Sequence, residues 1–221
     1  MIPPLLLSLK LALVTSCLLF VFGLPIAWWL AFTRARVRFL VESVLSLPIV
    51  LPPTVLGFYL LLALGSRGSL GAFWERLTGH TLAFSFEGLV IGSVIYSLPF
   101  AVQPFTSALA AVDRRLLMAS ESLGASAWRT FRLVTFPLAL PGIITGFALS
   151  FAHTLGEFGV VLMLGGNIPG RTQTASIAIY DNVQTLDYSA AARQCLTLLA
   201  ISFALLVLIN AINPQRNWRL Q

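Results

Sequence analysis

Long, uninterrupted apolar stretches are the feature that most limits what this chain can fold into. Five of them cover roughly residues 11–33, 43–64, 88–111, 141–164 and 190–212. A helix of about 20 residues matches the hydrocarbon thickness of a bilayer, about 30 Å. Backbone groups in lipid must be bonded internally, and these runs lack the period-two alternation of membrane strands. The sequence therefore predicts an all-α integral membrane protein with about five transmembrane helices.

Composition supports lipid as the solvent. The chain is 57% hydrophobic and only 10% charged, with a mean hydropathy of +0.89, whereas about a quarter of the residues in a soluble domain are charged. A net charge of +6 favours nucleic acid in some proteins, but no basic face interleaved with aromatic residues is present here. We therefore expect membrane lipid and no nucleic acid as a partner.

Arginine placement predicts the orientation of the chain. Nine arginines follow the first, third and fifth apolar stretches, and four lie on the other side of the membrane in this topology. Because arginine gathers in cytoplasmic loops, the amino terminus is expected outside and the carboxyl terminus in the cytoplasm, with segments 65–87 and 165–189 facing outward. The nine are Arg34, Arg36, Arg38, Arg114, Arg115, Arg129, Arg132, Arg216 and Arg219, and the four are Arg67, Arg76, Arg171 and Arg193.

Prolines mark where the helices are expected to bend. The second apolar stretch carries Pro48, Pro52 and Pro53, and proline removes a backbone donor and kinks or interrupts a helix. At membrane depth such a break persists only beside protein or a wet cavity, so Pro52 and Pro53 are pore or gate candidates. The third stretch, which contains Pro99 and Pro104, is expected to bend, and the fourth helix is expected to begin at Pro141.

The segment 112–141 is long for a connection between membrane helices, and its composition is helical. Leucines and small residues recur at spacings of three and four up to Gly124. Gly124 then breaks the run, and Ser126 is a candidate cap for a second helix that begins near Trp128. A short helix, a glycine bend and a second helix suit docking into the groove of a partner. The alternative is a structured loop that lies on the membrane interface.

The residues of this segment resemble the "EAA" loop of ABC-importer permeases. The resemblance rests on Ala119–Ser126, on Trp128-Arg129 and on Phe136–Gly142, although Met118 replaces the family's glutamate and Ser120 its second alanine. It implies a type I (MetI-like) permease whose coupling helix sits in a cleft of the ATP-hydrolysing subunit. The coupling residues that it implies are Ala119, Ser120, Glu121, Gly124, Ala125 and Pro141.

Further matches narrow the resemblance and extend over most of the chain, 1–221, read as a single transmembrane permease domain. Leu47–Gly57, Leu155–Gly159 and Gly166–Thr172 are similar to the permease of bacterial molybdate importers. That family implies two permease copies, two ATP-binding subunits and one periplasmic oxyanion-binding protein that supplies selectivity. Molybdate import across the inner membrane by alternating access is the expected function. Sulfate, thiosulfate and tungstate remain alternatives, as does, from a different class, a secondary transporter that works alone.

Polar residues within the spans point to no chemistry of their own. Glu157 is the only acid within a predicted span, and His153 lies four residues earlier on the same helical face. The pair is too small for a metal site, so a His153–Glu157 hydrogen bond or helix termination at Gly156 and Gly159 is expected, with Glu157 a gate candidate. Gly165–Thr172 mimics a phosphate-binding loop but follows a membrane helix rather than a strand. We predict no enzymatic activity, no cofactor and no metal in this subunit.

Overall fold

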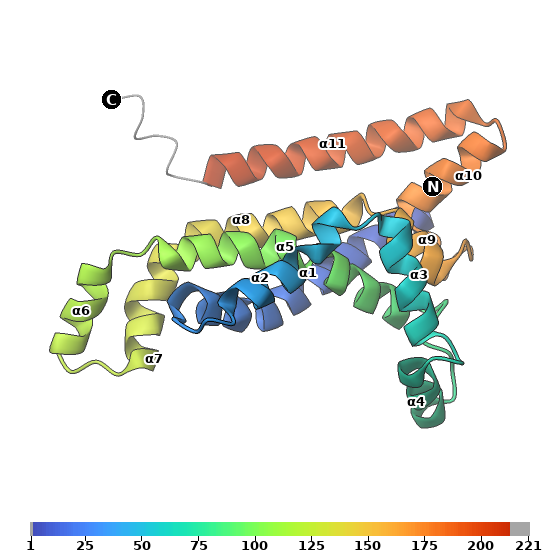
Figure 1. Ribbon diagram of the computed structural model, residues 1–221. Helices are drawn as coiled ribbons and strands as arrows, with labels where there is room; N and C mark the ends of the chain where they lie inside the picture. The colour runs from blue at the N-terminus through green and yellow to red at the C-terminus, as the bar shows by residue number, and fades with distance from the viewer. Residues whose placement is uncertain (1, 213–221) are drawn as a thin grey trace.

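The computed structural model describes residues 2–212, and within that range every regular element is helical (Figure 1). Residues 213–221, which include Arg216 and Arg219 of the charge argument, lie outside the described part. The elements are α1 (Ile2–Phe32), α2 (Arg38–Val50), α3 (Pro53–Leu64), α4 (Ser69–Thr78), α5 (Phe86–Ala110), α6 (Arg114–Ser122), α7 (Ala127–Thr130), a π-helical turn η1 (Phe131–Thr135), α8 (Phe136–Leu155), α9 (Gly159–Gly165), α10 (Ala175–Gln184) and α11 (Tyr188–Ile212).

Four helices are long and apolar enough to cross a bilayer. They are α1, α5, the continuous helix Ala127–Leu155 formed by α7, η1 and α8, and Tyr188–Val207 of α11. A fifth span is reached if α2 and α3 are taken together, although these two helices meet at 110° across their break. The prediction of an all-α membrane protein with about five spans is confirmed.

The core of the bundle is the contact between α1, α5 and α8. Phe105 of α5 is fully buried there among small residues such as Ala27 and Ala101. A Cβ atom built on Gly146 of α8 would lie 2.7 Å from the Phe105 ring, and one on Gly142 would lie 2.4 Å from the Cβ of Ala108. Small residues let membrane helices approach closely, since lipid gives apolar side chains little reason to associate. Glycine therefore sets the spacing of α5 and α8.

A second buried cluster lies where α9 packs against α3 and α5. It contains Leu89, Val160 and Leu164. Glycines again permit the approach: a Cβ on Gly92 would meet the Leu164 side chain at 2.3 Å, and one on Gly57 would meet the Cβ of Met163 at 2.8 Å. Helix α9 is thus held from two sides.

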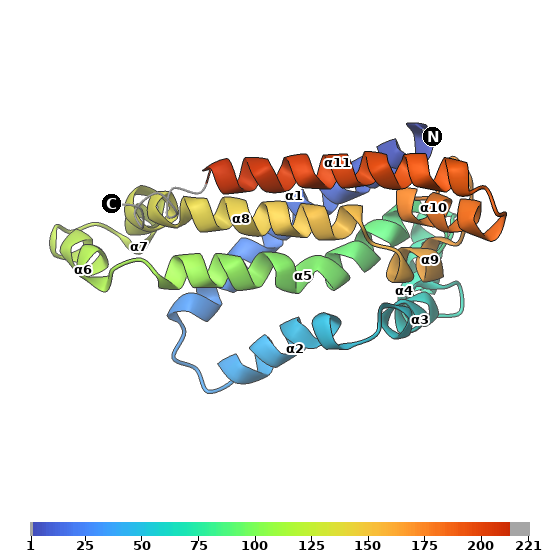
Figure 2. The same cartoon turned by 90° about the horizontal axis from the view of Figure 1, so that it is seen from above.

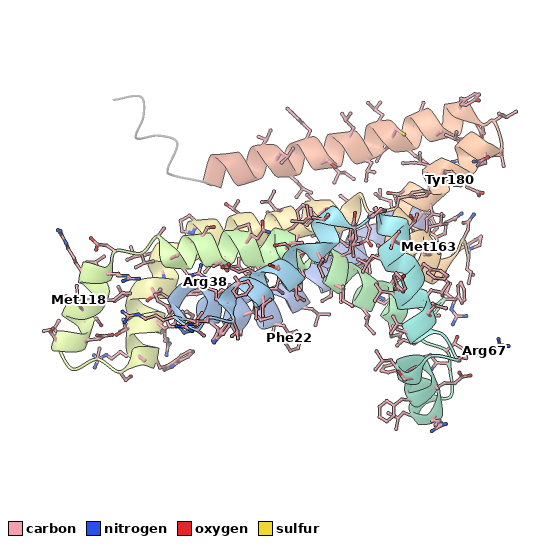
Figure 3. The ribbon with its side chains drawn as sticks, viewed as in Figure 1. Phe22, Arg38, Arg67, Met118, Met163 and Tyr180 are labelled. Carbon is pink, nitrogen blue, oxygen red and sulfur yellow. The ribbon has the colours of Figure 1, made fainter. Side chains whose placement is uncertain are left out.

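The two ends of the bundle carry different elements. Helices α6 and α7 lie at one end, and α3, α4, α9 and α10 lie at the other (Figures 1 and 2). Met118 of α6 and Arg67 near α4 mark these opposite ends in Figure 3. Segments 65–87 and 165–189, which the sequence places on one side of the membrane, therefore share an end, and 112–126 occupies the other.

The predicted bounds of the first and fourth helices were wrong, and the predicted interruption of the second stretch at its prolines is confirmed. The first helix begins at Ile2 rather than near residue 11, and Lys10 is accommodated inside it with its ammonium 4.5 Å from the Phe86 ring centre. The second stretch forms two helices, because the backbone turns extended at Leu51 and Pro52. The fourth helix begins at Ala127 and ends at Leu155, so Pro141 lies inside it.

Pro141 lies inside the helix although it has no backbone N–H to donate. Membrane helices accept proline where hydroxyl side chains and local π-type adjustments satisfy the freed backbone groups. Here the missing Pro141 N–H frees the Pro137 carbonyl, and the π-helical turn η1 lies directly before α8. The Thr145 hydroxyl donates to the Pro141 carbonyl itself at 2.9 Å. The Ser126 cap, not the proline, therefore determines where this helix starts.

Replacing Gly146 by alanine tests the close contact between α5 and α8. The added methyl group would overlap a Phe105 ring that is fully buried, and overpacking of this kind costs about 1–3 kcal/mol. We expect a lower thermal unfolding temperature for Gly146→Ala in detergent. The matched control is Gly156→Ala, whose Cβ would lie 3.8 Å from the Ala152 carbonyl oxygen, an ordinary contact distance; equal stability of the two variants would contradict the packing argument.

Candidate functional site

The first candidate site is the elbow formed by α6, the bend at Gly124 and α7, residues 113–130. Asp113 caps α6 by accepting a hydrogen bond from the Arg115 backbone N–H at 2.8 Å. Gly124 adopts φ +77°, a left-handed conformation that glycine takes without the cost of a Cβ. Ser126 then caps α7 by accepting from the Arg129 N–H at 3.3 Å. A short helix, a glycine bend and the capped start of the long helix Ala127–Leu155 follow directly from these local signals.

One hydrogen bond ties the two arms of the elbow together. The hydroxyls of Ser120 on α6 and Thr130 on α7 lie 2.8 Å apart, and Thr130 is buried. The Ala125 N–H also donates to the Ser120 carbonyl at 3.1 Å and closes the turn. Ser120, which stands where the EAA pattern has its second alanine, therefore has a structural role that a serine hydroxyl is needed to perform.

The elbow presents apolar side chains to its surroundings. Leu123 at the bend is 87% exposed, Trp128 69% and Met118 57%. Exposed apolar residues gathered on a small element mark interaction surfaces. Among the predicted coupling residues, Ala119, Ser120, Glu121, Gly124 and Ala125 all lie in this elbow. Pro141 does not: it lines a cavity of about 510 Å³ between α5, the start of α6 and α8, together with Asp113 and Leu116.

Aromatic stacking joins the elbow to the membrane helices, and this connection was missed from the sequence. Phe131 stacks on Trp128 with ring centres 5.5 Å apart and meets Trp28 of α1 edge to face at 4.6 Å. The ring centres of Phe131 and Phe136 lie 5.8 Å apart. The elbow thus contacts α1 through Trp28 and continues directly into α8. The only sequence signal was the aromatic content of 128–136, which does not identify Trp28 as the partner.

The second candidate site is the break between α2 and α3. Pro53 at the start of α3 packs against Gly159 at the start of α9, where a Cβ would lie 2.6 Å from the Cβ of Pro53. The Leu-Pro-Pro and Gly-Glu-Phe-Gly motifs, about a hundred residues apart in sequence, thus meet in space. Pro52 and Pro53 lie at the point where the chain turns by 110°.

Glu157 lies beside this contact, in the break between α8 and α9 rather than inside a helix. It is only 4% exposed, and both carboxylate oxygens, like the neighbouring buried Ser93 hydroxyl, lack a hydrogen bond to any residue that the structure describes. The predicted His153–Glu157 hydrogen bond is wrong. His153 bonds instead to the Ser97 hydroxyl at 2.9 Å and stacks on Phe100, while α8 ends at Gly156 as the alternative prediction required.

The segment Gly165–Thr172 does not form a phosphate-binding loop. It follows helix α9, and the Thr172 hydroxyl is occupied by a 2.6 Å bond to the Gly165 carbonyl. Gly166 has a positive φ, and the Phe84 N–H donates to the Leu164 carbonyl at 2.8 Å, which holds the loop against the start of α5. The motif is a structural turn at the α9 end of the bundle.

The sequence pattern of the family described as "Binding-protein-dependent transport system inner membrane component" matches residues 23–216. The chain therefore belongs to this family, the permease subunits of ABC importers.

Its relatives include permeases named for molybdenum. The chain is 52% identical over 185 residues to the molybdenum transport system permease protein ModB of Azotobacter vinelandii, covering 84% of this chain and 82% of that one. It is 41% identical to ModB of Escherichia coli strain K12, with 92% and 89% covered. It is also 34% identical to a probable sulfate transport system permease protein, cysT of Chlorella vulgaris, with 93% and 77% covered.

Solved structures with the same fold are ABC-importer components. A bacterial transporter involved in import of the acidic polysaccharide alginate aligns with a TM-score of 0.72 at 16% identity, over 94% of this chain and 78% of that one. The MetNI methionine transporter aligns at 0.69 and 19% identity, over 95% and 94%. The predicted type I permease architecture is confirmed.

Removing the hydroxyl of Ser120 tests the tie within the elbow. Ser120→Ala loses the bond to Thr130, and a side-chain hydrogen bond contributes about 1 kcal/mol. We expect faster hydrogen–deuterium exchange in residues 114–125 of the purified protein. Ser122→Ala is the matched control, because the Ser122 hydroxyl bonds only to the Met118 carbonyl of its own helix. Equal exchange in both variants would show that the tie does not order the elbow.

Proposed function

We propose that this chain is the permease of an ATP-driven importer of molybdate, and that the elbow of residues 113–130 is its contact with the ATPase. The observation that carries the proposal is the elbow itself: a capped helix, a left-handed glycine and a second capped helix at one end of the bundle, with Leu123, Trp128 and Met118 exposed. Short amphipathic helices dock into grooves of partner proteins. Ala119, Glu121 and Ala125 contribute small or polar contacts on this docking surface.

The partners in this proposal supply what the chain lacks. ATP hydrolysis is assigned to two ATP-binding subunits, and a second copy of the permease completes the path. A periplasmic oxyanion-binding protein delivers the anion at the end that carries α3, α4, α9 and α10. The amino terminus, at that same end in Figure 1, then faces outward. The arginine-rich loops and the elbow lie in the cytoplasm, in keeping with the positive-inside rule.

Alternating access in this proposal uses the two candidate sites together. Movement of the elbow reaches α1 and α8 through Trp28, Phe131 and Phe136. Helix α8 leads directly to Gly156 and Glu157, beside the contact of Gly159 with Pro53. We therefore assign Pro52, Pro53 and Glu157 to the gate in this proposal. A charged carboxylate repels a dianion, so in this proposal Glu157 is a residue of the gate and not a ligand of the substrate.

Molybdate is the proposed anion because the relatives named for molybdenum reach 52% identity, whereas the sulfate-named relative quoted above has 34%. The importer assembled with its partners in vesicles is expected to accumulate labelled molybdate only when ATP is present. A tenfold excess of sulfate is expected to compete weakly, since the binding protein supplies selectivity. Uptake driven by an ion gradient without the ATPase would instead favour a secondary transporter, and strong competition by sulfate would reassign the anion.

The bend at Gly124 is expected to be necessary for coupling. Gly124→Val forces a branched side chain into φ +77°, and left-handed backbone costs about 1–2 kcal/mol for a residue with a Cβ. We expect uptake per ATP hydrolysed to fall about tenfold, since about 1.4 kcal/mol corresponds to that factor. The matched control is Gly79→Val, at the opposite end of the bundle with φ +77° and, like Gly124, nothing within 4 Å of its Cβ position. Unchanged coupling in Gly124→Val would remove the elbow from the mechanism.

A further inference from the structure

A cavity of about 400 Å³ lies between α2 and α5, on the elbow side of the Pro52–Pro53 bend. Its polar lining comes from both helices, and Leu30 of α1, Leu45, Pro99 and Val102 form its apolar wall. Since a water molecule occupies about 30 Å³ in the liquid, this space holds a tetrahedral oxyanion together with part of its hydration shell. The polar lining residues are Arg38, Glu42, Ser46, Gln103, Thr106 and Ser107.

The hydrogen-bonding capacity of this lining suits an anion. A tetrahedral oxyanion offers only acceptors, so it needs donors around it. Arg38 uses its Nε–H on Glu42 at 2.8 Å and retains its terminal N–H groups. The Gln103 amide donates one N–H to the Ser46 hydroxyl at 3.2 Å and keeps the second, and the Ser46 and Ser107 hydroxyls keep donors as well. Thr106 is excluded as a donor because its hydroxyl donates to the Val102 carbonyl.

The charge arrangement favours brief occupancy over storage. Arg38 and Glu42 form an i,i+4 ion pair, and each side chain is 43% exposed. A dianion that approaches Arg38 is attracted by the guanidinium and repelled by the adjacent carboxylate, so its net attraction is small. A transport path requires sites that bind weakly enough to release what they admit. Glu42 provides that weakening without removing the donors.

The cavity lies between the proposed gate and the elbow end of the bundle, on the side where the anion would leave. Arg38 begins α2, and the same helix ends at the 110° break beside Pro52. Figure 3 places the Arg38 side chain toward the elbow half of the bundle, away from Arg67 at the opposite end. An anion that passed the bend would meet this lining before it left on the elbow side.

We propose that the cavity between α2 and α5 is a transient oxyanion site of the transport path, in which Arg38, Gln103 and Ser107 donate to the anion and Glu42 limits its residence. This inference rests on the proposed function and adds the residues that contact the substrate on the cytoplasmic side of the gate. The proposal requires that Arg38 attracts the bound anion and that Glu42 repels the same anion.

The test measures protection of a thiol within the cavity. Ser46→Cys is made in a background of Cys17→Ala and Cys195→Ala, because both native cysteines are exposed. The complete importer is assembled in vesicles of zwitterionic lipid, so that no anionic headgroup competes. The rate at which a water-soluble thiol reagent modifies the S46C variant is then measured against molybdate, and separately against sulfate. We expect molybdate to slow the reaction.

Three charge variants of this background decide the roles. Arg38→Gln is expected to raise the molybdate concentration for half-protection about tenfold, as for the loss of a hydrogen bond to a charged group. Glu42→Gln is expected to lower it because the repulsion between the carboxylate and the anion is removed. Arg34→Gln removes an arginine four residues away that does not line the cavity, and it is expected to change nothing. Absence of protection, or equal effects of Arg38→Gln and Arg34→Gln, would overturn the site. If Arg38→Gln fails to assemble, the opposite shift in Glu42→Gln still decides.

ATP-driven uptake by the parent complex separates this inference from the proposed function. Uptake without protection of S46C would remove the cavity from the path and leave the importer intact. Protection that follows the charge variants in a complex that imports neither anion would retain the site and reject the proposed transport. Slower uptake in Arg38→Gln than in Arg34→Gln, with ATP hydrolysis retained, is the result expected if both hold.

Discussion

The close approach of α1, α5 and α8 is the contact on which the rest of the structure depends. Glycine and alanine occupy the positions where these helices meet, and the Phe105 ring fills the space that they leave. Lipid solvates a leucine as well as another helix does, so tight backbone contact has to supply much of the association. With these three helices fixed, the elbow and the α2–α3 break become attachments at the two ends of one rigid unit.

The two ends of that unit differ in their chemistry as well as in their elements. The elbow end carries most of the described arginines and an apolar docking surface around Leu123 and Trp128, whereas the other end carries glycine-rich turns and the contact of Pro53 with Gly159. Helix α8 runs between them, from the Ser126-capped turn of α7 to Gly156. A single helix that joins a partner-binding surface to a proline break gives force applied at one end a direct route to the other.

Polar groups inside this apolar bundle are arranged so that most have a partner. His153 and Thr154 both bond to Ser97, and Ser150 bonds to Ser16 across α8 and α1. Buried polar groups in lipid are costly unless satisfied. The Thr15, Ser93, Thr135 and Thr174 hydroxyls, the Trp74 indole N–H and both Glu157 oxygens lack a partner among the described residues. Glu157 is the one ionisable side chain in this group, and its position beside the Pro53–Gly159 contact places the cost of burying it in the part of the chain that the proposed mechanism moves.

The sequence by itself determined the helical class, the approximate spans, the Gly124 bend, the Ser126 cap and the break at Pro52, because hydropathy, caps and proline act over a few neighbouring residues. Only the tertiary structure decided that Pro53 meets Gly159, that His153 bonds to Ser97 rather than Glu157, and that Trp28 meets Phe131 edge to face. It also decided that α3 turns by 110° and that Pro141 lies within a helix. These features depend on contacts between residues far apart in the chain, which local patterns do not encode.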